Sequence, residues 1–224
     1  MTSARFATIA LSAALACASA GALTISSDFS ASDEGWTANN AWSIEHRGDD
    51  GNPGGFLVVD NVDASAFASI VAPGKFLGDL SAFNGGSIAF DGKTISRNGP
   101  DWNPIGGCAN YGCLMLQGAG IIRTRDLAPG VPGTDAWSTY SAPLTADYWG
   151  IGEADWVRLL SRLSYIQLSI EGVFGAEVQG IDNFRIMSAP IPEPATHALL
   201  AVGLSVVFWA RRRRRRQCVV ALPA

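Results

Sequence analysis

Tyr165-Ile166-Gln167-Leu168-Ser169-Ile170-Glu171 carries the plainest structural signal in this chain. The apolar residues at positions 166, 168 and 170 alternate with polar residues at 167, 169 and 171. This is the period of a β-strand with one buried face and one wet face. The segment therefore predicts a strand that packs one side against a hydrophobic core.

Similar short runs extend from this segment across the chain between residues 21 and 189. Further strands are predicted at residues 56–59, 69–71, 87–90, 114–116 and 180–187. Clusters of Gly, Pro, Asn and Asp separate them, which is typical of chains with many turns. The segment 152–163 has helical spacing, with Ala154, Val157 and Leu160, and Leu163 as a further candidate, three apart on one side. Many short strands with one accessory helix predict an all-β sandwich.

The first 20 residues have the three parts of a secretory signal peptide. Arg5 supplies the early charge, residues 6–16 are apolar, and Ala18-Ser19-Ala20 places small residues before a predicted cut at Gly21. The apolar run is too short to span a bilayer core about 30 Å thick. Cleavage after Ala22 is an alternative, and a buried N-terminal helix is a less favoured interpretation.

The other end of the chain carries a second targeting unit. Pro192, Glu193 and Pro194 come first, and an apolar run at 195–210 follows. At about 1.5 Å per residue the run makes a helix of roughly 24 Å, slightly short for a core of about 30 Å, so we expect local bilayer thinning. Six arginines come next: Arg211, Arg212, Arg213, Arg214, Arg215 and Arg216. The positive-inside rule predicts that they and the tail 218–224 stay cytoplasmic.

This order of Ile191-Pro192-Glu193-Pro194, short apolar helix and arginine cluster resembles the PEP-CTERM sorting signal, over residues 190–217. The resemblance implies recognition by an exosortase, an integral-membrane transpeptidase-like enzyme of Gram-negative bacteria that make extracellular polysaccharide. It implies export across the inner membrane, a transient membrane anchor, and a final place on the cell surface or outside the cell. A plain C-terminal anchor is the alternative, since it shares every feature except the Pro-Glu-Pro.

Residues 21–189 have the length of one domain and a strongly acidic balance. Seven of the chain's 16 Lys+Arg and one of its 20 Asp+Glu lie outside this range. Nine basic and 19 acidic side chains remain, so the domain has a net charge of −10. Such a surface repels nucleic acid and suits extracellular proteins and divalent cations. We therefore expect no nucleic-acid partner.

Two cysteines, Cys108 and Cys113, lie in this domain and close a small loop. In an exported chain the expected outcome is a local disulfide. The rival is half of a zinc site, but the domain's sequence has His46 as its one histidine and no second cysteine pair. The composition therefore favours the disulfide.

Two segments of the domain carry a further family pattern: Ala72-Pro73-Gly74-Lys75-Phe76-Leu77-Gly78-Asp79-Leu80 and Gly85-Gly86-Ser87-Ile88-Ala89-Phe90-Asp91. With Glu34-Gly35-Trp36 near the start and Gly180-Ile181-Asp182-Asn183-Phe184-Arg185 at the end, residues 28–187 resemble the laminin B (laminin IV type A) domain. The resemblance implies a jelly-roll β-sandwich of the galactose-binding-like kind. The insertion 98–112 departs from the pattern and leaves its loop geometry open.

The sequence offers little catalytic chemistry. It has no Gly-x-Ser-x-Gly elbow, no His-Glu-x-x-His and no phosphate-binding glycine loop. A nucleophilic triad would have to use His46. Nineteen acids form close pairs by chance as readily as they form a glycosidase pair. We therefore expect a protein that is not an enzyme.

Aromatic residues point instead to binding, because exposed rings on loops stack well on sugar faces. Trp102 lies in a loop of Gly, Pro and Asn, with Tyr111 close to it in sequence, and this pair is predicted to form a binding platform. Trp36, Trp137 and Trp156 are expected in the core instead.

A structural Ca²⁺ ion is the single cofactor that the sequence suggests, and none is required. Asp49, Asp50 and Asn52 could supply oxygen ligands from one turn, with Asp182 from the last strand and Asp28 as a further ligand. Jelly rolls that resemble this domain often hold such an ion. The same acidic turn is also typical of an ordinary solvated loop.

These patterns predict an exported, exosortase-sorted protein of the cell surface or extracellular matrix. Its laminin-B-like module is expected to be a non-catalytic adhesion or binding module associated with extracellular polysaccharide. The alternative is a lectin-like protein with a defined glycan site, and a polysaccharide hydrolase is the least favoured function.

Overall fold

The computed structural model describes residues 22–39, 43–61, 68–101, 108, 110–134, 136–190 and 203–209. Residues 22–190 form one compact unit. The predicted signal peptide, the sorting residues Pro192, Glu193 and Pro194, Trp102, and the arginines at 211–216 lie outside the described residues. Of the apolar run at 195–210, residues 203–209 are described, and they are helical. No helix among the described residues has the length and apolar character that crossing a membrane requires.

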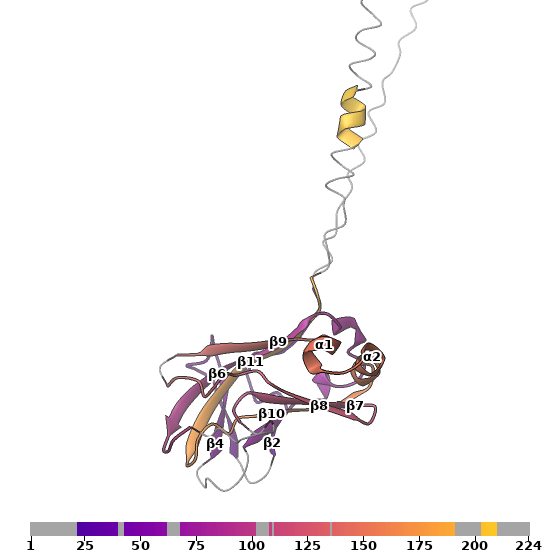
Figure 1. Cartoon of the computed structure of the whole chain (residues 1–224). Coiled ribbons are helices and arrows are strands. Elements are labelled where there is room, and N and C mark those ends of the chain that lie inside the picture. Colours follow the sequence, from indigo (N-terminus) through magenta and orange to yellow (C-terminus); the bar gives the residue numbers. More distant parts are fainter. Residues whose placement is uncertain are drawn as a thin grey trace, which may run out of the picture. The chain divides into compact units, whose positions relative to one another are not determined.

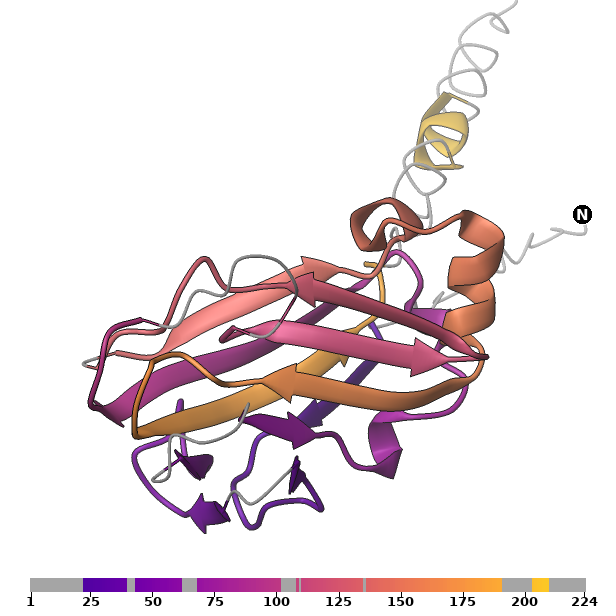
Figure 2. The ribbon, with the colours of Figure 1, turned by 60° about the horizontal axis from the view of Figure 1, so that its bottom comes forward.

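Two antiparallel sheets lie as layers in the 22–190 unit (Figures 1 and 2). The first has the order β3-β4-β11-β6-β9, with β1 also paired to β11, and the second has the order β2-β5-β10-β7-β8. The strands of the first sheet are β1 (Thr24–Ser27), β3 (Ser43–Arg47), β4 (Phe56–Asn61), β6 (Ser87–Arg97), β9 (Ser138–Pro143) and β11 (Glu177–Met187). Those of the second are β2 (Thr37–Asn39), β5 (Ser69–Val71), β7 (Cys113–Gly118), β8 (Ile121–Asp126) and β10 (Leu163–Ser169). The predicted β-sandwich is confirmed.

Strand β10 contains residues 165–169 of the alternating segment, and residues 165–168 follow the predicted period, whereas Ser169 and Glu171, predicted on the wet face, are buried. Ile166 and Leu168 are fully buried, whereas Tyr165 and Gln167 are partly exposed. Because successive side chains of a strand point to opposite faces, the first two face the core and the second two face away from it.

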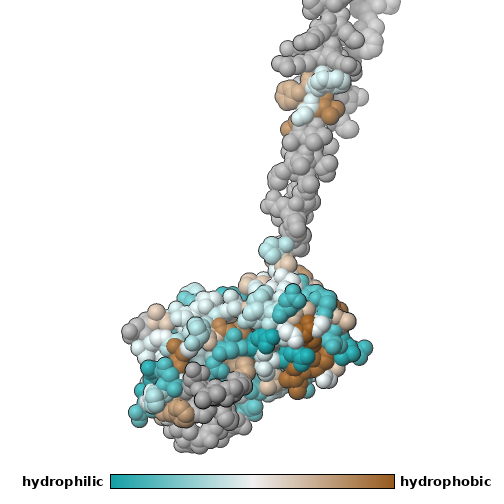
Figure 3. Space-filling model, viewed as in Figure 1, coloured by the Kyte–Doolittle hydropathy of each residue, from teal (hydrophilic) through white to brown (hydrophobic). Residues whose placement is uncertain are grey.

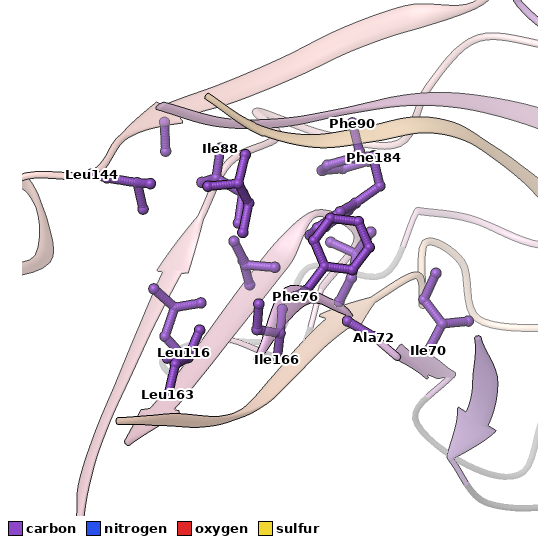
Figure 4. Close-up of a cluster of buried hydrophobic side chains, with 14 of the residues drawn as sticks. Ile70, Ala72, Phe76, Ile88, Phe90, Leu116, Leu144, Leu163, Ile166 and Phe184 are labelled. Atoms are coloured by element: carbon purple, nitrogen blue, oxygen red, sulfur yellow. The ribbon is translucent and has the colours of Figure 1, made fainter. Parts of the chain in front are cut away.

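The core lies between the sheets and is apolar over most of its length (Figure 4). Trp36 packs edge-to-face on Phe76 and Phe184, with ring centroids 5.8 and 4.7 Å away. Trp36 and Trp156 are buried as predicted, but Trp137 is partly exposed, with its ring against Phe56 at 5.3 Å.

Two short α-helices, α1 (Ala146–Trp149) and α2 (Glu153–Leu160), and two 3-10 turns, η1 (Gly74–Phe76) and η2 (Ser81–Phe83), connect the strands. The predicted helix is present as α2, but its predicted apolar face is wrong at Ala154 and Val157. Trp156, Leu159 and Leu160 are buried, whereas Ala154 and Val157 are exposed.

The large ring of Trp156 decides which face of α2 turns inward. It stacks on Trp149 at 5.9 Å and donates its indole N–H to the Asn84 side chain at 2.8 Å. Positions 156, 159 and 160 have the i, i+3, i+4 spacing of one compact apolar stripe, whereas positions 154, 157 and 160 drift around the helix. Leu163, which shares the predicted face, begins strand β10 instead.

Strand β11 is the centre of the first sheet, and one of its edges is shared by two partners. Met187 to Phe184 pair with β1, and residues 177–181 pair with β4. Asp182 and Asn183 therefore have no strand partner on this edge in the described chain. The pairing with β6 on the other edge also shifts register here, and Asn183 has a φ of 49°.

Candidate functional site

The outer face of the second sheet carries a continuous row of side chains across all five strands. The pairing registers align them in the order Thr37, Val71, Gln167, Met115 and Thr124. Each is partly or fully exposed. None is charged, although the domain has a net charge of −10.

A tyrosine and an amide lie at the middle of this face. The Tyr165 hydroxyl donates to Gln167 Oε1 at 3.0 Å, and Asn39 Nδ2 lies 3.5 Å from the same oxygen. Partial burial raises the pKa of the Tyr165 phenol, so the hydroxyl stays protonated at neutral pH. The face thus combines a flat ring with uncharged donors and acceptors, which suits a polyhydroxyl ligand.

A cavity of about 160 Å³ lies next to the disulfide loop. Its lining residues are Asp101, Asn110, Tyr111, Asp126, Pro129, Gly130 and Val131. Asp126 Oδ2 accepts a hydrogen bond from Asn110 Nδ2 at 2.6 Å, and its Oδ1 accepts one from the Ala128 backbone N–H at 3.1 Å. Asp101 forms an ion pair with Arg97.

The predicted Trp102–Tyr111 platform does not hold for Tyr111. Its side chain is only 1% exposed, and its ring lies against Phe90 and Tyr140 with centroids 6.2 and 5.9 Å away. Burial raises the pKa of its phenol, and the hydroxyl has no hydrogen-bond partner in the described structure. The segment after Asn110 turns inward, because Gly112 at φ +81° lets the loop pass close over Ala128.

The expected disulfide between Cys108 and Cys113 is present. It closes the loop that contains Asn110, one of the cavity residues. Gly112 in the same loop donates its N–H to Ser169 O at 2.9 Å and accepts the Leu127 N–H at 3.0 Å. The loop is therefore held from both sides.

The residues predicted for calcium are only partly brought together. Asn52 reaches Asp182 as expected, but through its backbone N–H, which donates to Asp182 Oδ2 at 2.6 Å. Asp182 Oδ1 accepts the Asn183 N–H, also at 2.6 Å. Asp49 and Asp50 are exposed, and Asp50 pairs with Lys93 at 3.4 Å.

A different acid, Asp91, joins this cluster. Its Oδ2 accepts hydrogen bonds from Asn52 Nδ2 at 3.0 Å and Asn183 Nδ2 at 2.9 Å. Burial, helped by the charges of Asp91 and Asp28, raises the pKa of Asp182 to about 6, although the two backbone hydrogen bonds lower it. In the described ranges no three acid, histidine or cysteine side chains form a group that could hold a metal ion.

Groups that could serve catalysis are engaged in other contacts. His46 Nε2 lies 2.7 Å from the carbonyl oxygen of Phe29. Glu177, whose pKa is raised by burial to about 7, is 2% exposed and bonds to Gly172 and Gln179.

Sequence reasoning did not find the row on the second sheet or the role of Asp91. The alternating pattern does mark Gln167 as outward-facing, but alignment with Met115 and Thr37 depends on registers across three other strand pairs. Asp91 lies within a predicted strand and gives no local signal of its partners.

Residues 190–215 match the PEP-CTERM protein-sorting motif, so the chain carries this motif at its C-terminal end. No curated protein matches the sequence. Similar solved structures include an exo-beta-agarase, with 16% identity over 75% of this chain and a TM-score of 0.51. A second agarase is 18% identical over 76% of this chain, also with a TM-score of 0.51. The chain spans about a quarter of each agarase, covering 25% and 26% of their lengths.

The L4b domain of human laminin alpha-2 is a further similar structure, with 15% identity, 60% of this chain and 80% of that chain covered, and a TM-score of 0.47. At such low identities the two agarases support the sandwich fold alone.

Proposed function

We propose that this chain is an exported surface protein, sorted by an exosortase, whose β-sandwich associates with extracellular polysaccharide without catalysis. The observation that carries the proposal is the PEP-CTERM sorting motif at 190–215, directly after the folded unit. An acidic exported domain followed by such a motif is expected to work outside the inner membrane and to leave its anchor after processing.

The outer face of the second sheet is the proposed contact with the polysaccharide. Gln167 and Tyr165 supply hydrogen-bonding groups and a ring, and Val71 and Met115 supply apolar area beside them. Five strands spaced about 4.8 Å apart make this face long enough for several sugars of one chain. The row of Thr37, Val71, Gln167, Met115 and Thr124 carries no charge, which favours uncharged polymers.

Two observations favour a binding module over a hydrolase. His46 is held against a backbone carbonyl, and the acid with the most raised pKa, Glu177, is buried beneath hydrogen-bonded neighbours. A glycosidase needs two accessible carboxyl groups on either side of the scissile bond. We also assign the sandwich to the jelly-roll, galactose-binding-like class, which the antiparallel pairing in both sheets supports.

The alternative is a lectin-like protein that recognises one defined glycan. The cavity beside Asp126 favours it, because a small concave site selects one sugar more strictly than an open face does. A glycan array separates the two functions: adhesion to polymer predicts weak binding to many related chains, and a lectin predicts one strong ligand.

A binding experiment with the exported protein tests the proposal. Extracellular polysaccharide from the producing cells should retain the protein in affinity electrophoresis and release no new reducing ends. Tyr165→Ala should weaken retention about tenfold, which corresponds to about 1.4 kcal/mol. Val157→Ala is the control, since Val157 is 43% exposed on α2 and lies outside the row.

No retention of the wild-type protein would overturn the proposal. Equal losses in the Tyr165 and Val157 variants would remove the second sheet as the contact. Release of reducing ends by the wild-type protein would favour the hydrolase instead.

A further inference from the structure

We propose that the cavity lined by Asp101, Asn110 and Asp126 binds the terminal, uncharged sugar of a polysaccharide chain. This inference rests on the proposed function and names the ligand of a second part of the same site. It assigns two contacts to one polymer: the sheet face takes the chain, and the cavity takes its end.

The size of the cavity fits one sugar ring. Its volume is about 160 Å³, whereas pockets for larger ligands measure about 300–1,000 Å³. Several linked sugars would not fit inside, so an internal stretch of polymer cannot enter. A single ring at a chain end or at the tip of a branch can.

The chemistry of the lining matches hydroxyl groups. Each carboxylate oxygen of Asp126 accepts one hydrogen bond, Oδ2 from Asn110 and Oδ1 from Ala128, and each keeps a further lone pair for a ligand. The Asn110 amide has a second N–H and a carbonyl oxygen for the same ligand. Pro129 and Val131 add apolar area beside these groups, which suits the C–H side of a sugar ring.

Charge decides which sugars are accepted. Asp101 is 61% exposed and its charge is offset by the ion pair with Arg97, whereas the exposed Asp126 accepts hydrogen bonds from the neutral groups of Asn110 and Ala128. A uronic acid or a sulfated sugar would place its own negative charge beside the Asp126 carboxylate in a domain of net charge −10. An uncharged sugar avoids this repulsion and can still donate its hydroxyl protons to the carboxylates.

The cavity is connected to the sheet face through Asp126. Thr124 of the outer row and Asp126 are two residues apart on β8, so their side chains point to the same side of the sheet. The cavity therefore begins where the uncharged row ends. The disulfide and the hydrogen bonds of Gly112 fix its wall before any ligand arrives, which lowers the cost of ordering it.

Calorimetric titration of the mature exported protein tests the inference. The probes are neutral tetrasaccharides of glucose and of galactose, a tetrasaccharide of glucuronate, and the neutral tetrasaccharides with a methylated terminal residue. At least one neutral tetrasaccharide should bind at least tenfold more tightly than the glucuronate one. Methylation of its terminal residue should remove most of this binding.

Three variants assign the effect to the cavity. Asp101→Asn and Asn110→Ala should each weaken the binding of the neutral tetrasaccharide about tenfold. Asp155→Asn is the matched control: Asp155 is 53% exposed and pairs with Arg158 on α2, much as Asp101 pairs with Arg97. Thermal melting shows whether each variant is folded, and Asn110→Ala counts only if it melts like the wild type.

The outcomes separate this inference from the proposed function. If polysaccharide is retained through Tyr165 but Asp101→Asn and Asn110→Ala bind like Asp155→Asn, the cavity subsite is wrong and the function stands. Glucuronate binding as tight as neutral binding would also overturn the subsite. If the wild-type protein binds neither polymer nor tetrasaccharide, both proposals fail.

Discussion

Glu177 is a single residue that is expected to make the stability of the whole sandwich depend on pH. Its carboxyl group is almost fully buried and accepts the Gly172 N–H at 2.9 Å. Its other oxygen lies 2.6 Å from the amide of Gln179. Thr94 continues the network, with its hydroxyl 3.0 Å from Gln179 Oε1 and 2.8 Å from the carbonyl oxygen of Pro132.

Burial and these hydrogen bonds act on Glu177 in opposite directions. The Gly172 N–H and the Gln179 NH₂ both donate to the carboxyl group and lower its pKa, whereas burial raises it by more.

The pH dependence of stability follows from this raised pKa. Burial holds the pKa of Glu177 at about 7 in the folded state, above its ordinary value of 4.5. The folded state therefore binds this proton more tightly than the unfolded state does. The resulting contribution to the free energy of unfolding is complete below pH 4.5 and is lost as the pH rises toward 7. A shift of this size corresponds to about 3 kcal/mol. Asp182 contributes in the same direction, because its pKa is also raised, to about 6.

Urea unfolding at pH 5 and pH 8 measures this effect. The wild-type domain should be more stable at pH 5, and Glu177→Gln should lose much of the difference, because glutamine copies the neutral acid. An unchanged difference between the two pH values in Glu177→Gln would contradict the assignment.

Elements act together where β11 leaves part of its edge open. The pairing of β1 with β11 ends at Phe184, and the pairing of β4 with β11 begins at Ile181. The turn that contains Asn52 fills this gap by binding Asp182 with its backbone and Asp91 with its side chain. Two carboxylates therefore lie under one turn, with Arg185 3.6 Å from Asp91 as the nearest cation in the described structure.

A structural calcium ion remains our proposal for this turn, held by carboxylate oxygens of Asp91 and Asp182 and by oxygens of the turn that contains Asn52, because no three acids of the described residues form a metal-binding group. An ion would offset the repulsion that raises the pKa of Asp182. Calcium at a hundredfold excess over its Kd should stabilise the domain by about 2.7 kcal/mol. The melting temperature should therefore rise with calcium and fall with EDTA at matched ionic strength.

Asp182→Asn is the variant that assigns this effect, and Asp79→Asn, an exposed acid outside the turn, is its control. Superimposable melting curves for the wild type with calcium and with EDTA, and no metal by elemental analysis, would end the proposal.

At the scale of the whole molecule, the first and last residues of the folded unit lie side by side. Leu23 and Ser188 exchange two hydrogen bonds, from Leu23 N to Ser188 Oγ and from Ser188 N to Leu23 O, each at 2.9 Å. Gly86 allows this close packing, because a Cβ there would lie 1.9 Å from Met187 O. The surface in view is mostly hydrophilic, and hydrophobic side chains gather near the α2 end (Figure 3).

Processing at the sorting motif should leave this unit intact. A cut between Pro192 and Ala195 falls outside the last strand pairing, at Met187, and outside the Leu23–Ser188 bonds. We expect the extracellular protein to have lost the arginines at 211–216 and to melt at the same temperature as the uncut chain. Intact-mass measurement of the extracellular protein checks the cut. Arginines on most mature molecules would show a plain membrane anchor instead.

Local patterns in the sequence determined much of this protein. The alternation at 165–171 predicts a strand with the correct inward residues, the two cysteines predict the bridge that forms, and the sorting motif is readable without any structure. These features depend on neighbours within a few residues, where backbone geometry fixes which side chains share a face.

Only the tertiary structure decided which distant residues meet. Tyr111 is buried because its loop folds inward, and α2 turns Trp156 to the core because Trp149 is there to receive it. The Asn52–Asp182 bond joins residues 130 positions apart, and the outer row depends on four strand registers at once. Such contacts are set by the packing of the whole chain against itself, because a strand's period fixes its faces but not its partners.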